Sequence, residues 1–236
     1  MGDLGRVLMV IPARGGSKRL PRKNVLLLAG KPLICWTIEA ALATKLNARI
    51  LVTSDDDEIL RIASSYKELG VLVHRRPDEL ATDTATTADV LIDAIKTESK
   101  FGHRPDTLIL LQPTSPLRQA EDILACVHLF EEAGCNDTVV SVCEVDHPSA
   151  WVGVLEGNSK LTGLDLQGNR SQDYRKEYRL NGAVYIARSQ NLIDKRSLYT
   201  EELLASVMPR LRSFDVDEEV DLFICNVLLG SQGLAK

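Results

Sequence analysis

Residues 7–12, VLMVIP, run directly into residues 13–24, ARGGSKRLPRKN, and this stretch decides the fold of the chain. The apolar run is typical of a strand that is buried on both faces of a parallel sheet. The loop after it holds two adjacent glycines, a serine and five cations. Ligands of open α/β sheets bind beyond the carboxyl ends of the strands, so the loop stands where a ligand is expected.

The composition of this loop suits a polyphosphate. Glycines let backbone N–H groups approach phosphate oxygens, and lysine and arginine neutralise their charge. The spacing matches neither the P-loop motif G-x-x-x-x-G-K-[ST] nor the dinucleotide motif G-x-G-x-x-G. A solvated basic turn would have the same composition, and Arg19 and Arg22 are expected to be solvated.

The composition of the whole chain is that of an ordinary globular protein. It has 236 residues, of which 44% are hydrophobic and 26% charged, and its formal net charge is −5. Such a chain can form a single α/β domain over residues 1–236. Without a global basic field, we expect neither nucleic acid nor an anionic membrane as a partner. No apolar stretch reaches the roughly 18 residues of a membrane span.

Cysteine and histidine usage favours a reducing compartment and argues against a zinc site. The five cysteines include no C-x-x-C pair, and the four histidines are scattered. Buried reduced thiols are the simplest interpretation, and no zinc-ligand spacing occurs. No charged segment with a cleavage site begins the chain. We therefore expect a cytoplasmic protein.

Strand-like and helix-like segments alternate along most of the chain. Helical spacing of apolar residues separates most of the predicted strands, and this βαβα order predicts a Rossmann-like, mostly parallel sheet with helices on both faces. The closing helix is expected to carry Val220, Phe223 and Val227 on its apolar face. The strands expected after the first are residues 49–53, 71–74, 107–111, 138–143, 183–187 and 211–214.

The alternation breaks between residues 144 and 180. Glycines punctuate short pieces there, and residues 151–155 and 160–162 resemble the two strands of a hairpin. The segment is either a surface excursion or an arm that meets a second subunit.

Asp215 and Asp217 follow the last predicted strand. In extended backbone, residues two apart point the same way, so both carboxylates can reach one hard cation. Mg²⁺ is usually held by one or two carboxylates together with substrate phosphates. The pair therefore predicts a magnesium site, although acids that cap the following helix would also stand here. Asp55, which also ends a strand, is expected to cap the next helix.

Five separate stretches resemble the pattern of the CMP-acylneuraminate (CMP-sialic acid) synthetase family, in the family's order and over nearly the whole chain. The resemblance implies a Rossmann-like domain with a protruding dimerisation arm, here residues 144–180, and hence a homodimer. It also implies the Mg²⁺-dependent reaction of CTP with a nine-carbon keto-sugar acid of sialic, legionaminic or pseudaminic type, which yields a CMP-sugar and pyrophosphate. The matching stretches are residues 11–24, 76–87, 111–118, 178–185 and 215–217.

The same resemblance assigns roles to residues of the first loop. Attack at the α-phosphorus of CTP places negative charge on the transferring group and on pyrophosphate, and fixed cations and N–H donors counter it without reorganisation. Lys18, Lys23, Asp215 and Asp217 are the implied catalytic residues, and the two aspartates the implied metal ligands. Nucleotide contacts are implied for Arg14, Gly15, Gly16, Ser17, Lys18, Lys23, Asn24, Arg76, Asp83, Ala85 and Thr87.

Base and sugar contacts follow from the resemblance as well. Arg76 matches the position that helps to read cytosine, whose O2 and N3 atoms need donors; an exposed arginine beside a helix cap is the alternative. Gln112 and Asn181 match sugar-contact positions, and their amides both donate and accept, as a polyhydroxylated acid requires. Each could instead be a satisfied structural amide.

The arm departs from the family pattern at two positions. The His147-Pro148 pair is followed by Ser149 where the family has a basic residue, and Arg170 is followed by Ser171 where the family has a second arginine. These positions reach the carboxylate of the sugar, so the identity of the sugar stays open. Arg170, Arg175 or Arg179 could supply the missing charge.

We therefore predict a cytidylyltransferase in which the anomeric hydroxyl of the sugar acid attacks the α-phosphorus of CTP. No histidine or glutamate stands out as a general base, so metal and positioning are expected to provide most of the catalysis. Two alternatives stay open. Asp-x-Asp on an α/β nucleotide domain also describes GT-A-type glycosyltransferases, and a catalytically silent nucleotide-binding or oligomerisation module would have the same fold.

Overall fold

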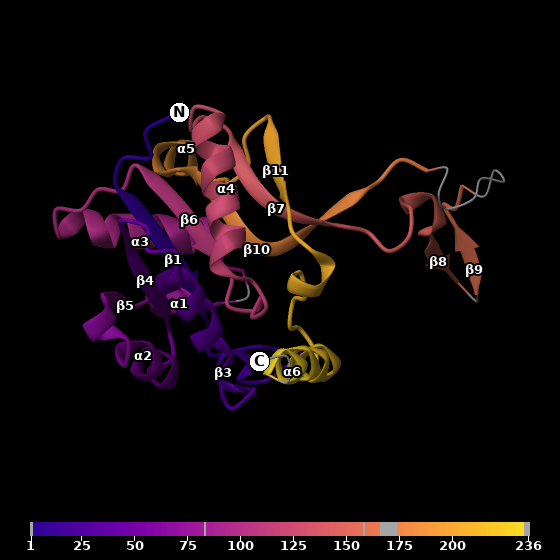
Figure 1. Ribbon diagram of the computed structural model, residues 1–236, viewed down its shortest axis with the longest axis horizontal. Helices are drawn as coiled ribbons and strands as arrows, with labels where there is room; N and C mark the ends of the chain where they lie inside the picture. The colour runs from indigo at the N-terminus through magenta and orange to yellow at the C-terminus, as the bar shows by residue number, and fades with distance from the viewer. Residues whose placement is uncertain (1, 83, 158, 166–173, 234–236) are drawn as a thin grey trace.

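A seven-stranded mixed sheet forms the centre of the computed structural model, which describes residues 2–82, 84–157, 159–165 and 174–233 (Figure 1). From one edge to the other the strands are β11 (Leu203–Val207), β7 (Thr138–Glu144), β10 (Tyr178–Arg188), β6 (Thr107–Leu111), β1 (Val7–Pro12), β4 (Ala48–Ser54) and β5 (Val71–Arg75). Strand β10 is antiparallel to both of its neighbours, and the other adjacent pairs are parallel. The mostly parallel sheet predicted from the sequence is confirmed.

Helices cover both faces of this sheet. Successive residues of β1 point to opposite faces: Met9 and Ile11 belong to one buried cluster, and Leu8 and Val10 to the other. The first cluster is completed by α1 (Leu33–Ala43), α2 (Asp57–Ser64) and α4 (Ala120–Glu132), and the second by α3 (Thr87–Lys100) and α5 (Ser189–Lys195). Burial on both faces explains why β1 is apolar at every position before its closing proline.

Side-chain caps fix where the helices begin. The Asp56 carboxylate accepts hydrogen bonds from the backbone N–H groups of Glu58 and Ile59, both at 3.0 Å, and so caps α2. The sequence-based assignment of this cap to Asp55 is therefore wrong. The Thr86 hydroxyl caps α3 by accepting from the Asp89 N–H.

The shorter elements connect these layers. A third apolar cluster joins α6 (Glu219–Gly233) to the loop after β1 through Leu20, Leu28 and Cys225. The remaining short elements are η1 (Lys23–Val25), β2 (Leu27–Leu28), β3 (Lys31–Pro32), η2 (Lys67–Leu69), η3 (Asp78–Leu80), η4 (Ser149–Trp151), β8 (Val154–Glu156), β9 (Lys160–Thr162) and η6 (Arg210–Arg212).

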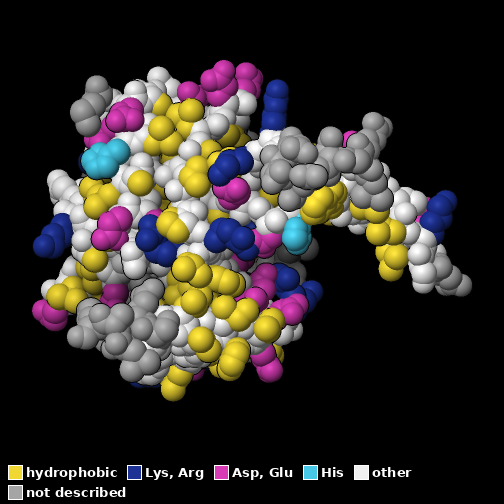
Figure 2. All heavy atoms as spheres, turned by 45° about the vertical axis from the view of Figure 1, so that its right-hand side comes forward, with side chains coloured by type: hydrophobic (Ala, Val, Ile, Leu, Met, Phe, Trp, Pro, Cys, Tyr) yellow, Lys and Arg dark blue, Asp and Glu magenta, His cyan; other side chains and the backbone are white. Residues whose placement is uncertain are grey.

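The segment between β7 and β10 projects from the body and ends in the β8–β9 hairpin (Figures 1 and 2). The two hairpin strands pair antiparallel, as predicted. At the root of the projection, the Glu177 carboxylate accepts from the backbone N–H and the hydroxyl of Ser149. Val154 and Leu155 are 67% and 68% exposed, so this chain alone leaves the apolar side chains of the hairpin in water.

The region before and within the last helix differs from prediction. No strand forms at residues 211–214, because Pro209 leads into the 3-10 turn Arg210–Arg212 instead. The strand at this edge of the sheet is β11, which lies earlier in the chain. In α6 the predicted face is wrong too: Val220, Phe223 and Val227 are 56%, 67% and 54% exposed. The residues that pack inward are Leu222, Cys225, Leu228 and Leu229.

The five cysteines are all buried and free. Among the described residues, the helices are too short or too polar for any of them to cross a lipid bilayer.

Candidate functional site

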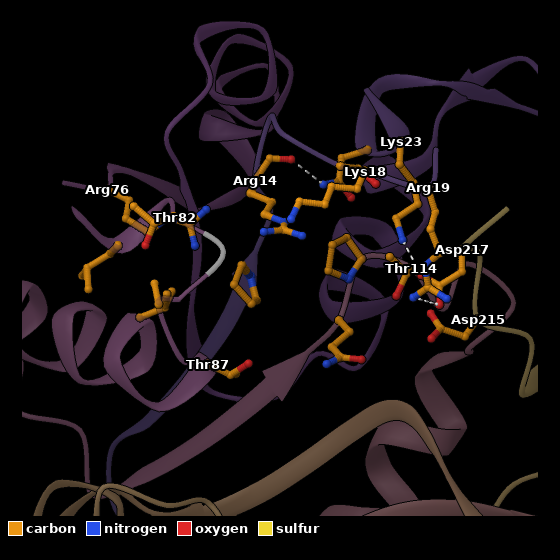
Figure 3. Close-up of a pocket in the computed structure, with 18 residues that line it drawn as sticks. Arg14, Lys18, Arg19, Lys23, Arg76, Thr82, Thr87, Thr114, Asp215 and Asp217 are labelled. Atoms are coloured by element: carbon orange, nitrogen blue, oxygen red, sulfur yellow. Dashed lines mark hydrogen bonds and ion pairs between the residues drawn. The ribbon is translucent and has the colours of Figure 1, made fainter. Parts of the chain in front are cut away.

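A cavity of about 650 Å³ opens at the carboxyl edge of β1 and β6 (Figure 3). The loop after β1 forms one of its walls, and the segment before α6 supplies two carboxylates on the same side. Most of the site residues predicted from the sequence line it. They are Arg14, Ser17, Lys18, Lys23, Asn24, Arg76, Ala85, Thr87, Gln112, Asp215 and Asp217.

The cationic loop and the carboxylate pair meet in this cavity. Lys23 Nζ donates to Asp217 Oδ1 at 2.9 Å, and Arg19 Nη2 lies 2.6 Å from Asp217 Oδ2 (Figure 3). Arg19 lines the cavity, and its side chain is 65% exposed, so it is solvated as expected. Arg22 is exposed too and pairs with Asp56 and Glu58 outside the cavity. Two segments at opposite ends of the sequence thus face one ligand-sized space.

The two aspartates differ in their surroundings. Asp215 Oδ1 is buried and has no hydrogen-bond partner within the described part of the chain. Burial raises the pKa of Asp215, a hydrogen bond with Thr114 opposes this, and the nearby Asp217 adds to the rise. The apolar residue between them, Val216, is fully buried, and its N–H donates to the Thr114 carbonyl at 2.8 Å. The backbone is thereby fixed so that both carboxylates face the cavity.

Helix capping does not account for these acids. The backbone N–H groups of Asp217 and Glu218 donate to the Asp221 carboxylate at 2.9 and 2.8 Å. Asp221 lies in the first turn of α6 and holds the backbone just before the helix, and among the described residues no N–H group of that turn donates to Asp215 or Asp217. The two carboxylates remain directed at the cavity.

Arg76 is held in place by a residue whose role the sequence did not reveal. Its side chain is buried, and Nη2 donates to the Ala13 carbonyl at 3.3 Å and to Asp55 Oδ1 at 3.2 Å. Burial lowers the pKa of the Arg76 guanidinium, and the Asp55 carboxylate opposes this effect. The same Asp55 oxygen accepts from the Gly15 N–H at 3.1 Å. Asp55 therefore braces both the first loop and Arg76.

The two glycines of the first loop do not line the cavity. The Gly15 N–H is bonded to Asp55, and a Cβ added at Gly15 would lie 2.6 Å from Asp56 Oδ2. Gly15 is thus required for close packing against Asp56 at the start of α2, and its N–H is already engaged. The nucleotide contact of Gly16 stays a prediction. Asn24 lines the cavity and also fixes the loop, since its Nδ2 donates to the Arg14 carbonyl at 3.0 Å.

Asn181 is a structural amide and not a sugar contact. It is 2% exposed and lies outside the cavity lining. Its oxygen accepts from the Ser141 hydroxyl and the Ala183 N–H, and its nitrogen donates to Ser213 Oγ and Met208 Sδ. These four bonds use its whole hydrogen-bonding capacity.

The remaining predicted positions fall outside the cavity or outside the described residues. Arg179 and Arg175 are exposed near the root of the projecting segment and do not line the cavity. Asp83 and Arg170 lie outside the residues that the structure describes.

A second cavity of about 250 Å³ adjoins the first, and Thr87 and Gln112 line both. The rings of Tyr185 and Tyr199 meet edge to face there, with centroids 6.4 Å apart. Arg196 also lines this space and forms an ion pair with Asp89. Sequence reasoning missed these residues, because Tyr185 looks like any strand residue and residues 196–199 carry no motif.

Comparison with known proteins shows which family this chain resembles. A family model described as cytidylyltransferase matches residues 8–199. N-acylneuraminate cytidylyltransferase from Escherichia coli O18:K1:H7 is 35% identical over 92% of this chain, which spans only 50% of that relative's length. CMP-N,N'-diacetyllegionaminic acid synthase from Legionella pneumophila is 36% identical over 95% of this chain and 96% of its own.

A solved structure shares the fold. The structure of CMP:2-keto-3-deoxy-manno-octonic acid synthetase complexed with CTP superposes with a TM-score of 0.72 over 96% of this chain and 99% of its own, at 18% identity. The family model and the relative matched along nearly its full length show that the chain belongs to the cytidylyltransferase family.

Proposed function

We propose that the protein transfers a cytidylyl group from CTP to a nine-carbon keto-sugar acid and releases pyrophosphate. One observation carries the proposal: Lys23 and Asp217 meet in a single cavity that is lined by further cations and by a second carboxylate. The relatives support the class of reaction, since one is named as an N-acylneuraminate cytidylyltransferase and another as a CMP-N,N'-diacetyllegionaminic acid synthase.

The triphosphate would lie between the first loop and the carboxylates. Arg14, Lys18, Arg19 and Lys23 concentrate positive charge on this side of a chain whose formal net charge is −5. Charge that develops on the transferring phosphoryl group and on the departing pyrophosphate would be countered by groups already in place. The hydroxyl of Ser17 adds a donor at the same wall.

The base would lie at the other end of the cavity, beside Arg76. Leu80 and Ala85 give that end an apolar lining, and Arg76 supplies a buried guanidinium. Arg76 Nε has no partner among the described residues, so a donor is available to the acceptor atoms of cytosine.

The donor set fits a Mg²⁺ ion. Asp215 Oδ1 is buried and unpartnered beside Asp217, which suits a hard cation. Within the described residues no group of three or more His, Cys, Asp or Glu side chains could hold a metal, so phosphate oxygens and water would complete the shell. When bound, Mg²⁺ would neutralise phosphate charge and lower the pKa of the attacking hydroxyl.

The acceptor sugar would occupy the second cavity. Gln112 stands at its junction with the nucleotide cavity, and Tyr185, Tyr199 and Arg196 provide further polar groups. An acid with many hydroxyls needs such mixed donors and acceptors. Its anomeric hydroxyl would then point through the junction at the α-phosphorus.

Two further features of the proposal concern the state of the protein. The exposed apolar side chains of the β8–β9 hairpin support a homodimer in which the projecting segment contacts the second subunit. The five buried free thiols support a cytoplasmic location.

A pyrophosphate-release assay tests the proposed reaction. The protein is incubated with CTP, Mg²⁺ and N-acetylneuraminic, legionaminic or pseudaminic acid in turn, and one of these acids is expected to give pyrophosphate and a CMP-sugar. A GT-A-type glycosyltransferase would instead consume a nucleotide-sugar and release no pyrophosphate. Tight CTP binding without product from any of the acids would favour a silent nucleotide-binding module.

A further inference from the structure

Gln112 occupies the junction of the two cavities, and its backbone is clamped from beneath by a buried arginine. Arg118 is 2% exposed, and its Nη1 donates to the Gln112 carbonyl at 3.1 Å and to the Ala183 carbonyl at 2.7 Å. One nitrogen thus ties the loop after β6 to β10, the strand beside it.

Burial of the Arg118 guanidinium costs free energy, and packing alone would not require a charged side chain at this position. Arg118 Nε and Nη2 have no hydrogen-bond partner among the described residues, and burial lowers the pKa of this guanidinium to about 9. An apolar side chain would fill the same space without desolvating a charge. The guanidinium is therefore best explained by the two carbonyls that it holds together.

The side chain of Gln112 is supported from β10 as well. The pairing of β10 with β7 shifts register between Leu180 and Tyr185, and Gly182 sits in this bulge at φ +76°. A Cβ at Gly182 would lie 2.5 Å from Gln112 Oε1. The amide of Gln112 can thus occupy its place only because residue 182 is glycine.

Asn181 fixes the bulge in turn. Its oxygen accepts from the Ala183 N–H at 3.2 Å, and its nitrogen donates to Ser213 Oγ at 2.9 Å. The bulge is therefore rigid, and so is the surface that it offers to Gln112.

We propose that Arg118 and Gly182 are positioning residues that set the Gln112 amide at the junction of the two cavities for hydrogen bonding to a hydroxyl of the acceptor. The inference rests on the proposed function for the identity of the acceptor. Neither residue lines either cavity, so both would act through Gln112.

Kinetics of two variants test this. Gly182→Ala is expected to raise the KM for the sugar acid about tenfold, the size of one lost hydrogen bond, with an unchanged KM for CTP. Arg118→Met should act in the same direction, and Arg118→Lys should recover part of the loss. Gly70→Ala is the matched control, because Gly70 also has a positive φ but no atom within 4 Å of an added Cβ; its kinetics should stay those of the parent.

A double-mutant cycle separates positioning from a general structural role. In a Gln112→Ala background, Gly182→Ala and Arg118→Met should raise the KM for the acid no further, since their target is gone. Additive effects, or an unchanged KM in Gly182→Ala, would overturn the proposal.

An NMR measurement that needs no turnover tests the positioning of Gln112 independently of the proposed function. In ¹⁵N-labelled protein, the side-chain amide resonance of Gln112 is assigned by its loss in Gln112→Ala. It should shift in Gly182→Ala and Arg118→Met and stay in place in Gly70→Ala. If no acid yields pyrophosphate, the proposed reaction is wrong, but the shifts of the Gln112 resonance still test the positioning. A Gln112 resonance that stays in place in Gly182→Ala and Arg118→Met would refute the positioning proposal.

Discussion

Lys23 Nζ lies 2.9 Å from Asp217 Oδ1, although the two residues are 194 positions apart in the chain. Lys23 opens the 3-10 turn at the end of the first loop, and Asp217 lies just before the last helix. Each group neutralises the other in the absence of ligand. A bound triphosphate would give Lys23 a new partner, and its cation would give Asp217 one. The contact between the two side chains therefore marks the proposed reaction centre.

Removal of the Asp217 charge is expected to abolish turnover and spare the fold. Asp217→Ala and Asp217→Asn should lower pyrophosphate release at saturating Mg²⁺ by at least about a hundredfold, the scale for loss of a fixed charge at a reacting phosphoryl group. The melting temperature should change little. Asp146→Asn, which breaks an exposed pair with Arg210, is the control and should keep full activity. Parent-like release from either Asp217 variant would contradict the metal assignment.

Asp215→Asn is expected to abolish activity without lowering the stability of the protein at pH 7. Burial raises the pKa of Asp215 in the folded protein, so the folded state binds this proton more tightly than the unfolded state, whose Asp pKa is about 3.9. The parent therefore loses stability as pH rises from that value through the raised pKa. The variant should melt at least as high as the parent at pH 7, and the difference should vanish near pH 4.

Melting curves from pH 4 to pH 8, measured without divalent cations, would check this. Pyrophosphate release by the same variant should be lost at every pH. A variant less stable than the parent at pH 7, with a difference that persists at low pH, would show that the Asp215 carboxylate supports the fold.

The strands buried on both faces were predictable, and β11 at one edge of the sheet was not. β1 is apolar because each of its faces meets helices, so composition alone identifies it. β11 has the sequence LLASV, and its Leu203 and Val207 remain 45% and 59% exposed. The buried residue of this strand is Ser206, so its hydrophobic residues do not report its burial, and its pairing with β7 makes it a strand.

Local sequence also could not separate three adjacent acids. Asp55, Asp56 and Asp57 follow β4 directly, and the chain uses each differently: the first braces Gly15 and Arg76, the second caps α2, and the third pairs with Arg75. The assignment depends on which way the backbone turns after the strand. That turn is set by contacts with the first loop, which are distant in sequence.

For the same reason, local sequence could not tell which predicted amide lines a cavity and which is buried in the interior. Gln112 and Asn181 offer the same chemistry, yet one lines both cavities and the other is fully bonded in the interior. By contrast, the cationic loop could be placed because it leaves the end of β1. Its meeting with the Asp-x-Asp pair followed from the family resemblance, because the strand expected before that pair does not form.

Loss of the Asp55 brace should weaken nucleotide binding through Arg76. Asp55→Ala removes the acceptor of the Gly15 N–H and of Arg76 Nη2, which should cost about 1–3 kcal/mol of stability. The Kd for CTP, measured by calorimetry, should rise about tenfold. Asp56→Ala is the neighbouring control, since loss of the α2 cap costs about 1 kcal/mol. Equal losses of CTP affinity in both variants would point to a general loosening of this region.

The projecting hairpin gives the last prediction. Leu155 is 68% exposed on β8, and a charge there should not disturb the isolated chain, because the side chain packs against little of it. If the hairpin contacts a second subunit, Leu155→Glu should bury a charge and shift a dimer to monomer in light scattering after size exclusion. Leu69→Glu introduces the same charge at a side chain that is 64% exposed on the body and should leave the parent's mass unchanged. A monomeric parent, or a Leu155→Glu variant that stays dimeric, would remove the hairpin from the interface and leave its exposed apolar residues without that explanation.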